Sequence, residues 1–290
     1  MRVGVLFSRI RPEEKLIMEA LDRRGVDYEM IDVRQVVYNL NHFDEWSNYS
    51  VVLERCVSHS QAATSLDILG YWGIPCVNQA HVAEICGDKR KTTQALIANG
   101  IPSPDVRIAF TVESALQAIQ EMGYPVVLKP IVGSWGRLLA KVNNQDSAEA
   151  VLNHKSSLGS LQHSIFYIQE YVEKGGQDIR TFVVGDETIC GITRSSEHWI
   201  TNTARGGRAA NFPITEEIDH LSRIASLAVG GGVLAVDIIE TASKGYVVNE
   251  VNYTMEFRNS IKPTGVDIPG KIVDFVIRVG EGMPVKTAVS

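Results

Sequence analysis

The chain has 290 residues and a formal net charge of −6, with 28 basic against 34 acidic side chains. This length fits two or three domains and is enough to bury a sizeable core. The acidic balance argues against non-specific binding to nucleic acid or to an anionic membrane surface, because both carry negative charge. No segment approaches the roughly 20 apolar residues of a membrane span, and the first strand carries arginines, so we expect neither a transmembrane helix nor a signal peptide.

The cysteine positions indicate neither a zinc site nor a disulfide scaffold. The spacings match no zinc motif, and a chain of this length does not need disulfide bonds to be stable. We expect small, buried thiols in a protein of the reducing cytoplasm. The residues concerned are Cys56, Cys76, Cys86 and Cys190.

The N-terminal part alternates short apolar strands with helices. Val3–Phe7 predicts a buried strand and Pro12–Arg24 a helix, in which proline suits the first turn and the following Gly25 suits the end. Together with the later elements, this alternation predicts a small α/β unit with a parallel sheet. Those elements are strands at Tyr28–Val33, Ser50–Leu53 and Pro75–Val77, and a helix near Ser60–Trp72.

The remaining chain first mixes helices and strands and then becomes strand-rich. His81–Asn99 predicts one long helix, which ends at Gly100 because two prolines follow closely. Helices are predicted at Thr111–Met122, Ser147–Lys155, Thr215–Val229 and Ile268–Val279, and strands at Pro125–Pro130, Leu138–Val142, Phe166–Val172, Ile179–Val184 and Glu187–Ser195. We divide the chain into an N-terminal α/β domain (1–86), a central subdomain (87–172) and a C-terminal sheet domain (173–290).

A predicted hairpin in the C-terminal part gathers oxygen-bearing side chains. Its strands are Val233–Glu240 and Gly245–Val251, so Asp237 lies across from Asn249 and Glu250. Asn252 shares a face with Glu250 because side chains alternate along a strand. Carboxylates in an apolar hairpin need a cation, and a few hard oxygen ligands suit Mg²⁺. The alternative, a solvated strand end, fits poorly because the flanking residues are apolar.

Two familiar phosphate motifs are excluded. Gly265–Lys271 has P-loop spacing, but Ile272 follows where serine or threonine binds Mg²⁺. The first strand is not followed by G-x-G-x-x-G, which argues against a dinucleotide site.

A different phosphate site is indicated further along the chain. Lys129 lies at the end of a buried strand, and Lys89 near a helix start is a second cation. A glycine-bearing loop follows Lys129, and its backbone N–H groups can turn toward an anion. Each feature alone is weak, but with the Mg²⁺ hairpin they indicate ATP held between lysines and metal. The loop residues are Gly133, Ser134, Trp135, Gly136 and Arg137.

An apolar strand at the next domain junction is a candidate for reading the adenine edge with free backbone groups. Its residues are Gln169, Glu170, Tyr171 and Val172, with Asp178 and Arg180 just beyond. Standing alone, this segment would be interpreted as a strand with a polar turn.

These motifs, in this order, resemble the ATP-grasp ligases of the RimK-type branch. The likeness runs from about Gly87 to the C-terminus, and the N-terminal unit fits the leading domain of that fold. Within the branch the chain is similar to the LysX family, which joins L-2-aminoadipate to the small acidic carrier protein LysW. The motifs that carry this likeness are Glu54–Ser58, Gly133–Lys141, Thr201–Gly207 and Met255–Ser260. The resemblance implies an ATP-grasp fold of mixed α/β and α+β class, with an N-terminal parallel α/β domain, a central lid subdomain and a C-terminal sheet domain.

The resemblance also implies roles for particular residues. Asn259 and Ser260 would shape the amino-acid pocket, where the glutamate-using sister enzymes carry Gly-Phe. Asp237, Glu250 and Asn252 would hold two Mg²⁺ ions, with Glu250 between them. Contacts to ATP would come from Lys89, Lys129, the Gly133–Arg137 loop, the Gln169–Arg180 segment, Arg194 and Asn202, of which Lys129 and Arg194 would act in catalysis with Glu250.

The implied reaction is ATP-dependent amide formation. The terminal glutamate of the carrier would attack ATP to give an acyl phosphate, which the α-amine of the amino acid would then displace. Two substrate carboxylates call for guanidinium partners, and Arg194, Arg205 and Arg258 are the candidates. Basic residues at Lys89–Lys91 and Arg205–Arg208 are candidates for docking the acidic carrier. We also expect a homo-oligomer.

Two alternatives stay open. The amino acid can be glutamate, or both acids, because one methylene is worth only about 1–3 kcal/mol of discrimination; more distantly, the chain can be another RimK-type glutamate ligase. The second alternative is an ATP-binding module without turnover, against which the intact set Asp237, Glu250 and Asn252 argues.

Overall fold

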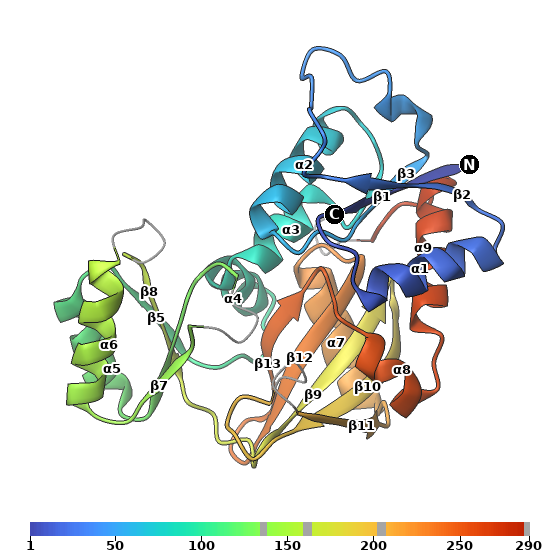
Figure 1. Cartoon of the computed structure of the whole chain (residues 1–290). Coiled ribbons are helices and arrows are strands. Elements are labelled where there is room, and N and C mark those ends of the chain that lie inside the picture. Colours follow the sequence, from blue (N-terminus) through green and yellow to red (C-terminus); the bar gives the residue numbers. More distant parts are fainter. Residues whose placement is uncertain (134–137, 159–163, 202–206, 287–290) are drawn as a thin grey trace.

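The computed structural model describes residues 1–133, 138–158, 164–201 and 207–286, and their strands form three sheets (Figure 1). The sheets follow one another along the chain, the first from residues 2–77, the second from 106–170 and the third from 177–252. This arrangement confirms the predicted α/β and α+β class. No helix among the described residues has the length and apolar character needed to cross a membrane.

The N-terminal sheet is parallel and has helices on both faces. Its elements are β1 (Arg2–Phe7), α1 (Pro12–Arg23), β2 (Asp27–Asp32), the 3₁₀ helix η1 (Trp46–Asn48), β3 (Val51–Glu54), α2 (His59–Tyr71), β4 (Cys76–Val77) and α3 (Ala80–Gly87). The strand order is β2-β1-β3-β4. Helices α2 and α3 share a core with one face, and α1 shares a core with the other. Burial on both faces explains why β1 and β3 are nearly continuous apolar runs, whereas β2 at the edge of the sheet is more polar.

The central sheet is antiparallel and has its own small core. Its elements are β5 (Val106–Ala109), α5 (Val112–Met122), β6 (Val126–Lys129), β7 (Ala140–Val142), α6 (Gln145–Ser157) and β8 (Phe166–Glu170), with strand order β5-β8-β6-β7. The preceding helix α4 (Lys89–Ala98) packs instead against α3, α7 and β13. Helices α5 and α6 lie together on the sheet (Figure 1), and Ile119 of α5 and Leu152 of α6 share a core with Phe166 of β8. The other face of the central sheet lines a cleft toward the C-terminal sheet.

The C-terminal sheet is antiparallel, and one of its edges is the predicted hairpin. Its elements are β9 (Gln177–Val184), β10 (Glu187–Ser195), β11 (Arg208–Phe212), α7 (Glu216–Ala228), β12 (Val233–Thr241), β13 (Gly245–Asn252), α8 (Arg258–Thr264) and α9 (Ile268–Gly280), with strand order β11-β10-β9-β12-β13. Helix α7 packs on one face, and α9 reaches back to pack against α1 of the N-terminal unit (Figure 1).

The N-terminal and C-terminal sheets share their cores, whereas the central core stands apart. Asn78, 3% exposed, ties the N-terminal unit to the C-terminal sheet. Its amide donates to the carbonyls of Val233 at 2.8 Å and Tyr253 at 2.7 Å, and its oxygen accepts the Val233 N–H at 2.6 Å. The hairpin of β12 and β13 is thereby fixed to the N-terminal unit.

The prediction of one helix over His81–Asn99 is wrong. The backbone is extended at Asp88, which forms a bridge with Val132 and caps α4 by accepting the N–H groups of Arg90 and Lys91. This break puts Lys89 at the start of a new helix that faces the cleft. The sequence patterns also missed strands β5 and β11 and helix α8. All four cysteines are buried and outside disulfides, as expected.

Candidate active site

The structure contains the predicted hairpin of β12 and β13, with a β-bulge next to Asp237. Asp237 pairs with Glu250, and Ile238 pairs with Val248, so Asn249 is the extra residue. A bulge redirects a side chain from a regular strand. Asn249 here faces the central subdomain, while Asp237 faces the neighbouring strand β9.

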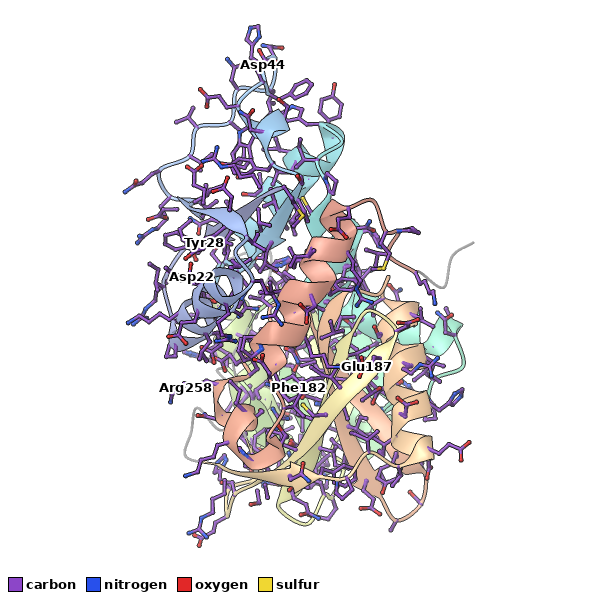
Figure 2. The ribbon with its side chains drawn as sticks, turned by 90° about the vertical axis from the view of Figure 1, so that its right-hand side faces the viewer. Asp22, Tyr28, Asp44, Phe182, Glu187 and Arg258 are labelled. Atoms are coloured by element: carbon purple, nitrogen blue, oxygen red, sulfur yellow. The ribbon has the colours of Figure 1, made fainter. Side chains whose placement is uncertain are left out.

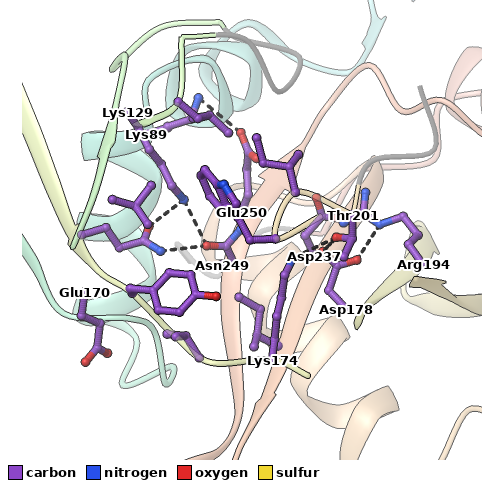
Figure 3. Close-up of a pocket in the computed structure, with 18 residues that line it drawn as sticks. Lys89, Lys129, Glu170, Lys174, Asp178, Arg194, Thr201, Asp237, Asn249 and Glu250 are labelled. Atoms are coloured by element: carbon purple, nitrogen blue, oxygen red, sulfur yellow. Dashed lines mark hydrogen bonds and ion pairs between the residues drawn. The ribbon is translucent and has the colours of Figure 1, made fainter. Parts of the chain in front are cut away.

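Asn249 joins the central and C-terminal sheets through a buried polar cluster (Figure 3). The Lys129 ammonium donates to Gln169 Oε1 at 2.8 Å and to Asn249 Oδ1 at 3.1 Å, and the Gln169 amide donates to Asn249 Oδ1 at 3.1 Å. Burial lowers the pKa of Lys129 to about 8. Its hydrogen-bond acceptors, the amide oxygens of Gln169 and Asn249, are neutral, so the ammonium is suited to an incoming anion.

Lys89 lies close to this cluster, next to Glu250 (Figure 3). Its ammonium donates to the Gly133 carbonyl at 2.7 Å and lies 3.4 Å from Glu250 Oε1. Lys89 and Lys129 therefore place two cations beside one carboxylate, which is a charge arrangement suited to polyphosphate and metal.

Asp237 is held by two arginines. Arg180 binds both carboxylate oxygens, at 2.6 and 2.7 Å, and Arg194 lies 3.2 Å from Oδ1. Burial alone would raise the pKa of Asp237, but these guanidiniums hold it at about 2. Asn252 donates to Asp237 Oδ2 at 3.4 Å, so two of the three predicted metal ligands are in contact.

A second cluster beside the first contains Asp178 and Arg194, which were predicted, and Lys174 and Thr201, which the sequence analysis did not single out. The Lys174 ammonium contacts Asp178 Oδ2 at 2.9 Å and Thr201 Oγ1 at 2.8 Å, and Arg194 binds Asp178 Oδ1 at 2.7 Å. The sequence did contain a signal for Lys174, because this residue lies four positions before Asp178 and directly before a pair of glycines.

The segment predicted to bind adenine has fewer free backbone N–H groups than expected. The N–H of Glu170 donates to Asp105 O at 2.9 Å, and that of Tyr171 donates to Pro125 O at 3.3 Å. The Glu170 side chain points away from the cluster, where it accepts the Asp105 N–H and pairs with Lys244 (Figure 3). Among the described residues, the Val172 N–H has no backbone partner, so it is the donor left for a base.

These residues line two pockets that meet at Arg194. The first pocket lies between the central and C-terminal sheets and is lined by Lys89, Val127, Lys129, Leu139, Gln169, Glu170, Tyr171, Val172, Lys174, Asp178, Arg194, Trp199, Ile200, Thr201, Asp237, Ile239, Asn249 and Glu250. The second pocket is lined by Arg11, Pro12, Glu13, Arg180, Ile192, Arg194, Glu256, Arg258, Asn259 and Ser260. Figure 2 shows Arg258 at the side of the molecule, below the helix that carries Asp22.

The comparisons with known proteins agree with this geometry. Residues 3–85 match the model of the LysX preATP-grasp domain, and residues 86–276 match that of the RimK-like ATP-grasp domain. The chain belongs to the RimK-like ATP-grasp family. Like the named members of this family, it is an ATP-dependent ligase that forms a carbon–nitrogen bond.

Relatives that are named for glutamate and relatives that are named for α-aminoadipate show similar sequence identity to this RimK-like ligase. The glutamate–LysW ligase ArgX of Sulfurisphaera tokodaii is 34% identical, over 95% of this chain and 98% of its own. The α-aminoadipate–LysW ligase LysX of Saccharolobus solfataricus is 36% identical, over 89% of this chain and 94% of its own. A crystal structure of a RimK domain ATP-grasp protein from Sphaerobacter thermophilus superposes with a TM-score of 0.82 at 29% identity, covering 96% of this chain and all of that one.

ATP-grasp ligases use ATP and Mg²⁺, and the donor set of this RimK-like ligase fits that ion. Asp237 and Glu250 are paired across the hairpin, and the Asn252 amide lies against Asp237. The described residues hold no cluster of three or more His, Cys, Asp or Glu side chains. Mg²⁺ commonly takes one or two carboxylates and completes its shell with water and phosphate oxygens. Asp237, Glu250 and Asn252 could therefore hold it.

The structure brings most of the predicted site residues to the two pockets. Lys89, Lys129, Arg194 and Glu250 line the first, with Gln169–Val172, Asp178 and Asp237. Arg180, Asn259 and Ser260 line the second. Arg180 was expected to contact ATP, but it lies in this second pocket and pairs with Asp237. The predicted residues Ser134, Trp135, Gly136, Arg137, Asn202 and Arg205 lie outside the described residues.

The basic segment Lys89–Lys91, a candidate for docking an acidic partner, presents less unpaired charge at the surface than expected. Lys89 is 9% exposed and turned into the first pocket. Arg90 pairs with Asp88, and Lys91 pairs with Glu84, so both charges are already balanced.

Proposed function

We propose that this ligase joins L-2-aminoadipate to the C-terminal glutamate of the carrier protein LysW. ATP would transfer its γ-phosphoryl group to the glutamate carboxylate, giving an acyl phosphate and ADP. The α-amine of aminoadipate would then attack the acyl carbon and release phosphate. The named relatives support a LysW-dependent ligase of this kind.

The observation that carries the proposal is the charge pattern of the second pocket. Among the described residues, four arginines and two glutamates line it, together with Asn259 and Ser260. Guanidinium groups bind carboxylates with paired hydrogen bonds. A small molecule with two carboxylates and one ammonium group matches this mixture of charges. An acidic amino acid is such a molecule.

The common wall of the two pockets supports the order of the reaction. Arg194 lines both, so an acyl phosphate made at the first pocket would lie beside an amine bound in the second. Lys89 and Lys129 would hold the phosphates of ATP, and the Val172 N–H would donate to adenine. Mg²⁺ bound by Asp237, Glu250 and Asn252 would neutralise the charge of the transferred phosphoryl group. We include two ions in the proposal, with Glu250 between them.

The choice of amino acid rests on Asn259 and Ser260. Ser260 is 2% exposed at the start of α8, and Asn259 is exposed beside it. Two small polar side chains leave room that a phenylalanine would fill, which favours the longer acid. The similarity to a glutamate–LysW ligase favours glutamate as the second candidate.

The test is a coupled assay with purified LysW, Mg²⁺ and ATP. ADP release and the mass of LysW are followed with aminoadipate and with glutamate in parallel. A mass gain with aminoadipate alone supports the proposal, and a gain with both acids makes the enzyme dual-specific. ADP release without a mass gain moves the reaction to another acceptor. Neither release nor gain would favour an ATP-binding module without turnover.

A further inference from the structure

Two carboxylates, Glu13 and Glu256, lie in the second pocket among its arginines. Glu13 stands in the first turn of α1 and is 6% exposed, whereas Glu256 lies between β13 and α8. A pocket that bound nothing but anions would be weakened by these acids, because like charges repel. Their presence points to a positive group on the ligand.

Three of the four arginines of the pocket do not need Glu256 as a counter-charge. They have acidic partners of their own: Arg11 pairs with Glu14, Arg180 with Asp237, and Arg194 with Asp178. Within the part of the chain that the structure describes, no group donates a hydrogen bond to the Glu256 carboxylate. This carboxylate is therefore available to a ligand.

The backbone on both sides of Glu256 is held in place. Arg55, 2% exposed, donates from Nη2 to the carbonyl of Met255 at 3.1 Å. Glu13 Oε1 accepts the N–H of Arg258 at 3.2 Å. These bonds fix the backbone from which the Glu256 side chain extends into the pocket, and preorganised backbone of this kind favours a binding or catalytic role.

We propose that Glu256 binds the α-ammonium group of the incoming amino acid and accepts its proton, with Glu13 completing the acidic end of the pocket. This inference rests on the proposed function. An ammonium ion has no lone pair and cannot attack a carbonyl carbon, so amide formation needs a base at this point. Glu256 would be a catalytic residue of the second half-reaction alone.

The proposed step balances in atoms and charge. One ammonium proton passes to the Glu256 carboxylate, and the freed nitrogen lone pair forms the C–N bond with the acyl carbon. The C–O bond to phosphate breaks, and phosphate leaves with that electron pair. Phosphate takes the second nitrogen proton, and Glu256 later returns its proton to solvent.

The surroundings of Glu256 favour a proton acceptor. Partial burial raises the pKa of Glu256, and the charge of Glu13 raises it further. Arg11, Arg55 and Arg180 face it from neighbouring elements and lower the pKa, but the net shift is upward. A base whose pKa lies closer to the working pH removes a proton more effectively.

The test separates the two half-reactions in Glu256→Gln. Hydroxylamine is unprotonated near pH 7, so it traps the acyl phosphate of LysW as a hydroxamate without help from a base. We expect hydroxamate formation in the variant to stay within about 3-fold of wild type, while amide formation from aminoadipate falls by about 100-fold or more. Raising the pH should restore amide formation in the variant more than in wild type, because solution then supplies free amine.

Two further variants control this result. Glu256→Asp keeps a carboxylate and should form the amide about tenfold faster than Glu256→Gln does. This variant keeps the test informative even if the glutamine variant folds poorly. Glu187→Gln removes an exposed carboxylate at the start of β10 (Figure 2) and should leave both reactions unchanged. Equal loss of both reactions in Glu256→Gln, or full amide formation, would overturn the inference. Wild-type protein that forms no hydroxamate with LysW would overturn the proposed function itself.

Discussion

Arg180 donates two hydrogen bonds to Asp237, from Nε to Oδ1 at 2.6 Å and from Nη2 to Oδ2 at 2.7 Å. The two residues are paired across the neighbouring strands β9 and β12. Arg180 lines the pocket proposed for the amino acid, and Asp237 lines the pocket proposed for the nucleotide. One ion pair therefore forms part of the wall between the two sites.

Removing this ion pair should destabilise the protein in a metal-dependent way. Arg180→Gln leaves the buried Asp237 carboxylate with a weaker set of partners, and we expect a loss of about 3 kcal/mol in the free energy of unfolding without Mg²⁺. Added Mg²⁺ should stabilise the variant more than wild type, because the ion replaces the missing positive charge. Urea titrations with EDTA and with Mg²⁺ measure both effects.

An exposed pair provides the control for that experiment. Arg223→Gln breaks the surface contact with Asp219 and should cost less than about 0.5 kcal/mol in either buffer. An identical response of Arg180→Gln and wild type to Mg²⁺ would mean that Asp237 is not a metal ligand.

Glu250→Gln should separate nucleotide binding from turnover. The amide keeps the shape of the side chain but loses the charge that would hold Mg²⁺, and we expect turnover to fall by roughly 10³-fold. ATP affinity should change much less, because Lys89 and Lys129 remain. Nucleotide titration and ADP release measure the two quantities, with Glu240→Gln on the exposed end of β12 as the control. Normal turnover in Glu250→Gln would remove this residue from the metal site.

Lys129→Met should weaken ATP binding. The buried ammonium would donate charge-assisted hydrogen bonds to phosphate, so its loss should raise the Kd for ATP by about 10- to 100-fold. Lys271→Met is the matched control, since that lysine is exposed and pairs with Glu187 far from the pocket. Isothermal titration calorimetry with ATP measures the Kd of both variants. If Lys129→Met bound ATP as tightly as Lys271→Met does, the phosphates would bind elsewhere.

Glu54 should make stability depend on pH. Burial raises the pKa of Glu54 to about 7, from an ordinary value of 4.5. The folded state then holds this proton more tightly than the unfolded state does, so the stabilisation is complete below pH 4.5 and is lost as pH rises through about 7. We expect a loss of about 3 kcal/mol in wild type across this window, and a smaller loss in Glu54→Gln.

Denaturant unfolding at several pH values provides that measurement. Glu121→Gln, which removes an exposed carboxylate from α5, should keep the wild-type pH profile. Parallel profiles for wild type and Glu54→Gln would mean that Glu54 keeps its ordinary pKa in the folded protein.

Asn259 and Ser260 should set the preference between aminoadipate and glutamate. Changing Asn259→Gly and Ser260→Phe together shortens the pocket, and we expect the ratio of the two kcat/KM values to shift toward glutamate by about 1–3 kcal/mol. Ser195→Ala, an exposed change at the end of β10, is the control. An unchanged ratio in the double variant would place the length selection elsewhere.

Much of the fold was readable from the sequence because local patterns determine it. The hairpin with Asp237 and Glu250 follows from two apolar strands and a turn, and the structure has it with the expected pairing. The helix over His81–Asn99 failed because its break at Asp88 depends on a bridge with the distant Val132. Periodicity along one segment cannot show a contact made across the fold.

The same limit applies to the site. Lys89, Lys129 and Glu250 could be named because each lies in a recognisable local motif. Glu13 could not, because it meets Arg258 through packing of α1 against the segment after β13, 245 positions away in the chain. The partner of Arg180 was likewise missed, since the neighbouring positions of β9 and β12 follow from the sheet order.

The most direct test of the central claim follows oxygen atoms. LysW with ¹⁸O in its terminal carboxylate is incubated with the enzyme, ATP, Mg²⁺ and aminoadipate, and the released phosphate is analysed by mass spectrometry. An acyl phosphate requires one carboxylate oxygen to leave with phosphorus, so the account predicts phosphate carrying one ¹⁸O for each amide formed. Unlabelled phosphate accompanying a normal yield of amide would contradict it.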